Sequence, residues 1–466
     1  VNVVNVGGDF GGKGDARDLP VAYFLAKQSG RPVKIIMTYG EELTAANPTH
    51  PTVVTVRSGV KRDGTLTARE VRTIHASGAY GALKPNAALS TWHYVGGAYR
   101  IPNTSFEFLQ IYTNHVPGGY FRAPGAHQYT FALESHTDML AQALGMDPVA
   151  FRLKNILHEG EVDAVGNKLR NIKAREVLAA ALSAADWQSE KPGPNFGRGI
   201  GVFGRQIGGG LAGVVLTAER DGTFVLTSPT VDVGTGTHTI MRQVVANEMG
   251  VALENIHVEA GDTEAAPFDE GPRASRVTYT EGTVVLKACA QLKNMLADGA
   301  SLPLTVTYAE DVPHIEDVVY FSTQVAEVEV DPETGQVKVH RVVTAHDVGT
   351  VINPVTHQGQ VAGGFVTGYG LAVTEELVMQ DGRIINGNLG DYKLPCIVDL
   401  PQLETVLVES PGGIGPYESK SIGELANNAT AAAIANAVAD AIGVRLFELP
   451  VTAERVYAAI QAKRKG

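Results

Sequence analysis

Two sequence blocks near opposite ends of the chain carry residues that could do chemistry. The first, residues 7–13 (GGDFGGK), has glycines at four of its first six positions, so its backbone can approach a ligand closely. The second, residues 420–424 (KSIGE), places one carboxylate, Glu424, on a glycine turn before an apolar stretch. Backbone amides and a lone carboxylate suggest an anionic cofactor with one general base, and not a hydrolytic triad.

Each block also has a simpler interpretation. Residues 7–13 are compatible with a tight turn between a strand and a helix, and they match neither a dinucleotide fingerprint nor a P-loop, since Gly14 follows Lys13. Phe10 has no local core partner, which favours a stacking role. Glu424 stands before a helical stretch, where a carboxylate is also a common helix cap. As a base it would need partial removal from water.

Three further segments could bind an anion or a polar ring. Residues 233–239 (VGTGTHT) open a helix, where free amides attract anions, or where Thr237 simply caps the helix. In residues 272–278 (PRASRVT), Arg273 and Arg276 could contact phosphate or a heterocycle, although the motif by itself slightly favours a solvated helix start. Arg122 lies in a rigid turn with Pro124 and Gly125, which favours a functional role.

The elements that must position these residues mix hairpins with helices. Strands are predicted over residues 1–6, 33–37, 52–60, 66–75, 213–218, 223–226, 304–308, 320–330 and 337–345. Helices are predicted over residues 15–28, 127–144, 148–156, 174–185, 237–249, 277–296, 427–442 and 453–462. The arrangement predicts an α+β fold of two interleaved α/β halves with one site at their interface. The predicted organisation is a domain over 1–160, a linker over 161–195 and a second domain over 196–466.

Composition limits the class of protein. The chain has 466 residues and a net charge of −12, which argues against nucleic acid or an anionic membrane as its main partner. It has two cysteines and no CxxC pair, so its own thiolates cannot hold an iron–sulfur cluster. No stretch reads as a signal peptide or membrane span. We expect a cytoplasmic protein, and the missing initiator Met suggests a piece of a longer polypeptide.

Taken in order along the chain, the motifs resemble those of the xanthine oxidase/aldehyde oxidase family of molybdenum hydroxylases. They comprise residues 7–13, 121–125, 234–236, 274–278, 352–354, 360–364, 391–395 and 420–424. The resemblance covers essentially the whole chain and corresponds to the C-terminal portion of the molybdenum-binding subunit. It implies the fold of that family's molybdopterin-binding region, with the cofactor between two halves.

The resemblance also assigns roles to residues. It implies a molybdopterin cofactor, expected in the cytosine dinucleotide form, whose dithiolene holds the molybdenum without direct protein ligands. Glu424 is the implied general base, and Phe10, Arg122 and Tyr120 line the substrate pocket. The implied cofactor-binding residues are Gly8, Phe10, Gly11, Gly12, Arg122, Gly234, Thr235, Gly236, Thr237, His238, Thr239, Ala274, Ser275, Arg276 and Gln360. The implied partners are an iron–sulfur subunit, an FAD subunit and the upstream part of the molybdenum subunit.

The sequence departs from the family pattern at several points. Gly14 replaces a glutamate found in members that oxidise xanthine, which speaks against purines as substrates. Thr235 stands where many members have glutamine, and Glu418-Ser419 replaces a Gly-Ala pair. The expected activity is therefore hydroxylation of an aldehyde or an N-heteroaromatic carbon. A non-catalytic cofactor-binding or assembly module is the alternative, and without the resemblance the residues support only an α+β protein that binds a phosphate-bearing ligand.

Overall fold

The computed structural model describes residues 6–13, 18–79 and 91–465. The predicted strand at 1–6 and Gly14 therefore lie largely or wholly outside the described residues. The helices are α1 (Leu19–Ser29), α2 (Tyr39–Ala45), α3 (Ala126–Ala143), α4 (Pro148–Asn155), α5 (Ala174–Ala184), α6 (Thr237–Met249), α7 (Val277–Ala297), α8 (Pro354–Tyr369), α9 (Leu389–Tyr392), α10 (Thr430–Ile442) and α11 (Ala453–Lys465).

The strands form separate sheets. They are β1 (Thr52–Val60), β2 (Leu66–Gly78), β3 (Thr104–Tyr112), β4 (Phe196–Ile207), β5 (Gly210–Ala218), β6 (Phe224–Ser228), β7 (Ile256–Ala260), β8 (Leu304–Val312), β9 (Ile315–Val330), β10 (Val337–Asp347), β11 (Met379–Gln380), β12 (Arg383–Ile384) and β13 (Gln402–Val408). Their orders are β1-β2-β3, β13-β10-β9-β4, β7-β6-β5-β8 and β11-β12.

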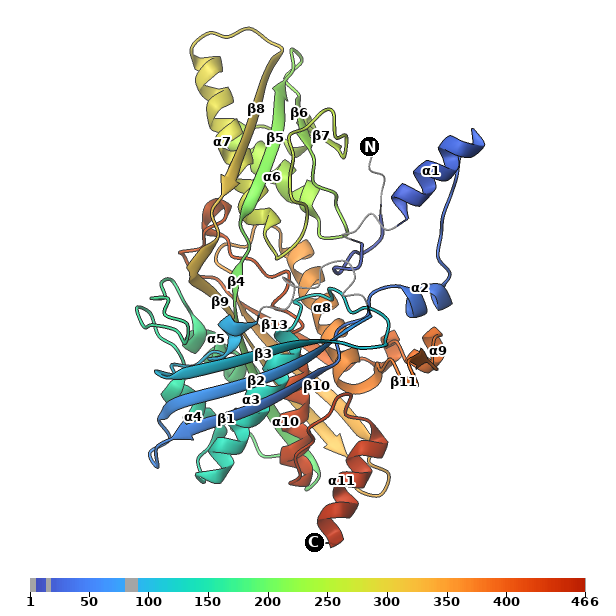
Figure 1. Cartoon of the computed structure of the whole chain (residues 1–466). Helices are drawn as coiled ribbons and strands as arrows, with labels where there is room; N and C mark the ends of the chain where they lie inside the picture. Colours follow the sequence, from blue (N-terminus) through green and yellow to red (C-terminus); the bar gives the residue numbers. More distant parts are fainter. Residues whose placement is uncertain (1–5, 14–17, 80–90, 466) are drawn as a thin grey trace.

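The sheets divide the molecule into a smaller lobe and a larger body. In Figure 1 the β7-β6-β5-β8 sheet forms the upper lobe together with α6 and α7. The body below contains the other two large sheets, with α3 and α10 packed between them. Two connections, β4 to β5 and β8 to β9, join the body to the lobe, since each pair follows directly along the chain. The junction of lobe and body is where distant segments meet.

Glycines on β4 allow α10 to lie unusually close to the body sheet. A Cβ atom added to Gly199 would lie 2.1 Å from the backbone nitrogen of Ala437, and one on Gly197 would lie 2.0 Å from the Ala437 oxygen. Gly201 would meet the backbone of Ala429 in the same way, at 2.5 Å. These glycines alternate along β4 and therefore share one face of the strand. This close packing fixes α10, which begins shortly after Glu424 in the chain.

Most predicted elements are present, with shifted ends, but one predicted strand is wrong. Residues 33–37 form no regular element, belong to no sheet of the described residues, and are mostly exposed. Strands β3, β4, β7, β11, β12 and β13 and helices α2, α8 and α9 were not predicted. The start of α8 does carry a sequence signal, because an asparagine at the cap followed by a proline is typical of a helix start. In the structure the Asn353 side chain accepts hydrogen bonds from the backbone nitrogens of Val355 and Thr356.

The proposed domain boundary within 161–195 stays a prediction. Helix α5, inside the proposed linker, packs against β9 and β10 of the body sheet. None of the helices in the described residues has the length and apolar character needed to cross a lipid bilayer.

We expect Gly199→Ala to lower the midpoint of urea unfolding, because the new methyl group would overlap the α10 backbone. Overpacking of this kind costs about 1–3 kcal/mol or more. Gly193→Ala is the matched control, since a Cβ at Gly193 meets no atom within 4 Å. Equal midpoints for the two variants would show that the β4–α10 contact is not as rigid as described.

Candidate functional site

A cavity of about 1230 Å³ opens at the junction of lobe and body. Its wall draws on the 7–13 loop, the turn at 120–124, the end of β4, the starts of α6, α7 and α8, and residues 419–424. Of the predicted site residues, the lining includes Phe10, Gly11, Tyr120, Arg122, Gly234, Thr235, Thr237, Ala274, Ser275, Arg276, Gln360 and Glu424. Gly8, Gly12 and Gly236 lie in the same loops, and His238 and Thr239 lie in the first turn of α6, but none of them contributes to this lining.

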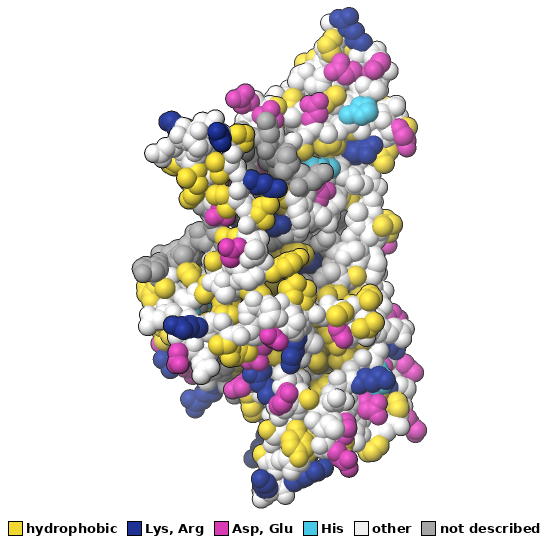
Figure 2. All heavy atoms as spheres, turned by 90° about the vertical axis from the view of Figure 1, so that its right-hand side faces the viewer, with side chains coloured by type: hydrophobic (Ala, Val, Ile, Leu, Met, Phe, Trp, Pro, Cys, Tyr) yellow, Lys and Arg dark blue, Asp and Glu magenta, His cyan; other side chains and the backbone are white. Residues whose placement is uncertain are grey.

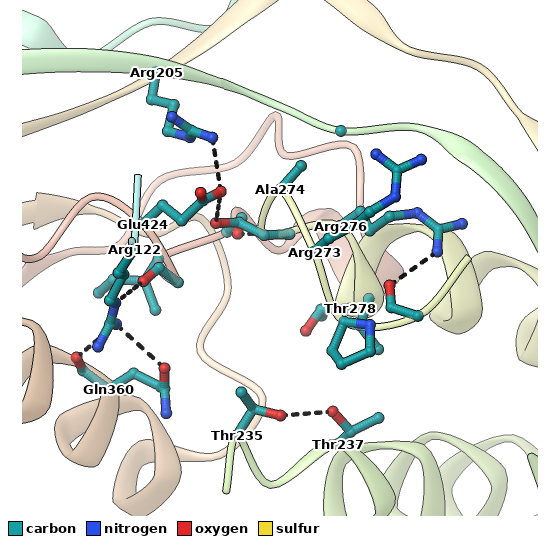
Figure 3. Close-up of a pocket in the computed structure, with 18 of the residues that line it drawn as sticks. Arg122, Arg205, Thr235, Thr237, Arg273, Ala274, Arg276, Thr278, Gln360 and Glu424 are labelled. Carbon is teal, nitrogen blue, oxygen red and sulfur yellow. Dashed lines mark hydrogen bonds and ion pairs between the residues drawn. The ribbon is translucent and has the colours of Figure 1, made fainter. Parts of the chain in front are cut away.

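Glu424 is held by donors from three separate segments (Figure 3). Its Oε2 accepts from Arg205 Nη2 at 2.7 Å and from Ser275 Oγ at 2.9 Å. Its Oε1 accepts from the backbone nitrogen of Ala123 at 3.1 Å. The carboxylate is only 14% exposed, so these donors replace most of the water it would otherwise bind. Its direction into the cavity is therefore fixed.

Arg205, at the end of β4, was not among the predicted site residues. Besides its ion pair with Glu424, its Nη1 donates to Tyr94 Oη at 2.6 Å. Its Nε is buried and has no hydrogen-bond partner among the described residues. Burial alone would lower the pKa of Arg205, but Glu424 and Tyr94 together outweigh burial and raise that pKa. The only sequence signal for this residue is an isolated arginine at the end of a glycine-rich strand.

Ser275 reaches Glu424 through a strained turn. Ala274 and Ser275 both have positive φ, 49° and 55°, a conformation that residues with side chains adopt rarely. The turn is held by Ser421 Oγ, which donates to the Ser275 carbonyl at 2.7 Å. A Cβ on Gly423 would lie 2.9 Å from Ser275 Oγ, so only glycine lets the 420–424 segment come this close. Ser275, a predicted cofactor-binding residue, and Glu424, the predicted base, therefore belong to the same hydrogen-bond network.

Arg122 ties the wall of the cavity together. Its Nε donates to the Gly423 carbonyl at 2.6 Å, and its Nη2 donates to the Gln360 carbonyl and side-chain oxygen at 3.1 and 3.3 Å. Asn427 Nδ2 in turn donates to the Arg122 carbonyl at 2.8 Å. Burial lowers the pKa of Arg122 to about 10, while Glu424 acts in the opposite direction. Arg122 uses most of its hydrogen-bond donors on other protein groups and so supports the backbone next to Glu424.

The 7–13 loop is shaped by its own aspartate. Asp9 accepts from the backbone nitrogens of Gly11 and Lys13, at 3.1 and 2.6 Å. Gly11 has φ of 101°, and a Cβ there would lie 2.7 Å from Tyr120, which seats the loop against the 120–124 turn. Phe10 is 55% exposed at the cavity wall. The ring is thus available for stacking, whereas two of the loop amides already have a carboxylate partner.

The 234–239 loop also closes around an internal carboxylate. Asp232 accepts from the backbone nitrogens of Gly234 and Gly236, at 2.9 and 3.1 Å, and of His238 at 3.4 Å. The cap of α6 is Gly236, with no side-chain hydrogen bond, and not Thr237. Thr237 instead shares a hydrogen bond of 2.8 Å with Thr235 (Figure 3). An anion that used these amides would have to replace Asp232.

The Arg276 side chain has a different place from the one expected. Its guanidinium is buried and donates to Asp269 at 3.1 Å and to the carbonyls of Gly209, Gly210, Leu211 and Gly271. An arginine has five N–H donors, and these contacts use all of them. The guanidinium therefore holds the lobe segments together, and a cofactor contact would require breaking one of these bonds. Arg273, beside it, is the arginine with an exposed side chain, paired with Glu270.

The composition of the cavity wall fits a large polar cofactor. The cavity is large enough for such a cofactor. Two of its lining residues, Arg205 and His357, have buried nitrogen atoms (Nε and Nε2) that find no hydrogen-bond partner among the described residues. Within the described ranges no group of three or more His, Cys, Asp and Glu side chains could hold a metal ion. That the molybdenum has no direct protein ligand remains a prediction.

Comparison with known proteins gives the family. The family model of the molybdopterin cofactor-binding domain matches residues 1–156, and a second model of the same description matches residues 177–311 and 305–401. A relative from Bacillus subtilis, named as a probable xanthine dehydrogenase subunit, is 32% identical over 98% of this chain and 68% of its own length. The chain belongs to the xanthine oxidase family of molybdenum-binding subunits. The molybdopterin-dependent oxidoreductase and α+β fold predictions are thereby confirmed.

Solved structures agree with this assignment. The chain is similar to the aldehyde oxidoreductase of Desulfovibrio gigas, with a TM-score of 0.87 and 28% identity over 97% of this chain and 54% of that one. The fold also matches quinoline 2-oxidoreductase of Pseudomonas putida 86, with a TM-score of 0.93 at 23% identity, over 99% of this chain and 68% of that one. This molybdenum-binding subunit therefore spans about one half to two thirds of the relatives that it matches.

A buried acidic residue lies behind the cavity wall. Glu281, in α7, is fully buried and accepts from Ser228 Oγ, while its Oε2 has no partner among the described residues. Burial raises the pKa of Glu281 to about 7; the Ser228 hydrogen bond and the charge of Arg276 oppose this, and the charge of Asp269 adds to it. The folded protein therefore keeps a proton on Glu281 under conditions where the unfolded chain has lost it.

This difference predicts a pH-dependent stability. Since the pKa of Glu281 rises from 4.5 to about 7 on folding, stability is lost as pH increases through that window. Glutamine does not titrate, so Glu281→Gln avoids this loss. Between pH 4.5 and 8 the free energy of unfolding of Glu281→Gln should rise by on the order of 3 kcal/mol relative to that of the unchanged protein, at about 1.4 kcal/mol per pH unit. Urea unfolding across this range measures the difference. Glu254→Gln, at an exposed position, is the control, and parallel curves for Glu281→Gln would contradict the assignment.

Proposed function

We propose that this chain oxidises an electron-poor carbon, in an aldehyde or an N-heteroaromatic ring, with Glu424 as the general base and water as the source of oxygen. One observation carries the proposal: the Glu424 carboxylate, oriented by three donors, faces a large cavity in a family of molybdopterin-dependent oxidoreductases. A relative from Megalodesulfovibrio gigas, 29% identical over 98% of this chain, is named an aldehyde oxidoreductase.

The cofactor of the proposed reaction is molybdopterin in its cytosine dinucleotide form. When bound, it supplies the metal that accepts the electrons of the reaction. Ala274, Ser275, Gln360 and Thr235 would hold its pterin through their backbone and polar groups. The 234–239 loop would take the diphosphate at the start of α6, where helix amides favour anions, in exchange for Asp232.

The residues of the chain then have separate tasks. Glu424 takes up the proton that the reaction releases at its carboxylate oxygen. Arg205 and Ser275 keep that oxygen pointed into the cavity, while Arg122 fixes the backbone on either side. Phe10, exposed at the cavity wall, would stack against a planar substrate. This division supports a substrate that is flat and uncharged near the base.

Electrons must leave through other redox centres, which we assign to partner polypeptides carrying iron–sulfur clusters and FAD. A relative from Paenarthrobacter nicotinovorans is named the gamma subunit of a 6-hydroxypseudooxynicotine dehydrogenase complex, and it is 30% identical over 99% of this chain. The two cysteines support this assignment, because Cys289 is buried and Cys396 lies apart from it in sequence.

We expect Glu424→Gln to lower turnover by about 10²–10⁴, the contribution typical of a general base, because an amide cannot accept the proton. Turnover of an aldehyde and N-heteroaromatic panel by the natively purified complex measures it, with molybdenum content determined in parallel. Glu418→Gln is the matched control, since it changes an exposed carboxylate in the same segment. Undiminished turnover in Glu424→Gln would falsify the assignment of the base.

Arg205 offers a separate test of how the base is positioned. We expect Arg205→Met to lower kcat about tenfold with a smaller change in KM, because the Glu424 carboxylate would lose the donor that orients it. Arg205→Lys retains a cationic donor and should restore part of the lost kcat. An equal loss of kcat in both variants, or a kcat in Arg205→Met equal to that of the unchanged protein, would contradict the positioning role.

A non-catalytic cofactor-binding or assembly module is the second candidate. It is favoured by the carboxylates of Asp9 and Asp232, which occupy loop amides that a bound cofactor would use. This alternative predicts no turnover of any substrate in the presence of all partner chains and loaded cofactor, so any measurable hydroxylation excludes it.

A further inference from the structure

Three consecutive ring-bearing residues, Trp92, His93 and Tyr94, form a short 3-10 helix that lines the cavity. Their rings are in contact: the centroids of Trp92 and His93 lie 5.8 Å apart, and those of His93 and Tyr94 lie 3.9 Å apart. Tyr94 is buried and packs against Phe203 of β4, with centroids 5.3 Å apart. Trp92, at the other end, is 46% exposed. This row of rings is therefore anchored in the core at Tyr94 and reaches solvent at Trp92.

His93 is the polar member of the row. Its ring lines the cavity and makes no hydrogen bond to another of the described residues. Burial, the charge of Arg205 and the charge of His314 lower the pKa of His93 to about 4. The ring is therefore neutral at pH 7, with one nitrogen that donates and one that accepts a hydrogen bond. A partly buried ring with both capacities unused is suited to orient a ligand in an otherwise apolar wall.

The row is joined to Glu424 through Arg205. Nη1 of Arg205 donates to Tyr94 Oη at 2.6 Å, and Nη2 donates to Glu424 Oε2 at 2.7 Å (Figure 3). The ring of His93 is in turn in contact with that of Tyr94. Glu424 and His93 are thus connected by two intervening side chains and line the same cavity.

Aromatic side chains from other segments also line this cavity. Phe10 of the 7–13 loop is 55% exposed, and Phe268, in the segment before α7, is 71% exposed. Figure 2 shows hydrophobic side chains gathered around the middle of the molecule, where the lobe meets the body. Exposed rings in a cavity favour a flat aromatic ligand, because stacking adds to the free energy gained by burial. A small aliphatic aldehyde would leave most of this surface unused.

We propose that His93 is a specificity-determining residue that donates a hydrogen bond to the ring nitrogen of a flat N-heteroaromatic substrate. The substrate presents one edge to Glu424 and its nitrogen to His93. The hydrogen bond draws electron density from the carbon beside the nitrogen, which is the carbon that the proposed reaction oxidises. This inference rests on the proposed function and chooses between its two substrate classes, since an aldehyde on a carbon ring offers no ring nitrogen. A site with an unpaired polar group also discriminates against a ligand that lacks the partner.

The first test measures binding of isoquinoline and naphthalene, two flat ligands of the same shape that differ in one ring nitrogen. Equilibrium dialysis of the natively purified complex, without an electron acceptor, gives the ratio of the two affinities. His93→Phe keeps a ring in the row and should lower the isoquinoline-to-naphthalene ratio about tenfold, the effect of one lost hydrogen bond. His257→Phe, at an exposed histidine outside the cavity lining, is the matched control and should leave the ratio unchanged. A ratio unchanged in His93→Phe, or no measurable binding of isoquinoline, overturns the proposal.

The second test compares turnover of isoquinoline with that of 2-naphthaldehyde. His93→Phe should lower kcat/KM for isoquinoline at least about tenfold and change that for 2-naphthaldehyde less than about threefold. His93→Asn retains an N–H donor and should restore part of the loss. Equal losses for the two substrates would show that His93 only supports the fold, and would overturn the proposal. If the unchanged complex oxidises neither compound, that result counts against the proposed function, while the affinity ratio still decides the role of His93.

Discussion

A carboxylate withdrawn from water must find hydrogen-bond donors, and the architecture of the cavity follows from that requirement. The donors to Glu424 are Ala123, Arg205 and Ser275, which lie far apart in sequence. Each comes from a different structural unit: the 120–124 turn, the strand that joins the body to the lobe, and the strained turn before α7. If any of these units shifted, the carboxylate would lose a partner in a region where water cannot fully replace it.

Close packing makes this network possible. The glycines of β4 bring α10 against the body sheet, and Gly423 brings the 420–424 segment against Ser275. At both places a single added methyl group would collide with neighbouring atoms. Lys420, buried four residues before Glu424, pairs with Asp347 at 2.8 Å and anchors the other end of the segment. Glu424 is therefore held from both sides by contacts with little room for adjustment.

The predicted site residues that line the cavity lie mostly in turns, because turns have local sequence signals. Glu424, Ser275 and Arg122 all stand beside glycines, prolines or small residues that restrict the backbone. Arg205 carried no such signal, since its role depends on the register and direction of β4. That strand was itself missed because Gly197, Gly199, Gly201 and Gly204 lower strand propensity, yet the first three are there for packing against α10. The strand predicted over residues 33–37 is wrong for another reason. The segment has the apolar pattern of a buried strand, but no described strand pairs with it.

The internal carboxylate of the 234–239 loop has a consequence for selectivity between anions. Asp232 is tethered two residues before the loop and accepts hydrogen bonds from its amides, so an anion that used these amides would have to displace it. The net affinity of such an anion would be the difference between its own affinity and that of Asp232 for the same amides. A singly charged ion such as chloride or acetate would gain little by this exchange, whereas a multiply charged group with several acceptor oxygens would gain more. The proposed diphosphate site would therefore discriminate against weakly binding anions.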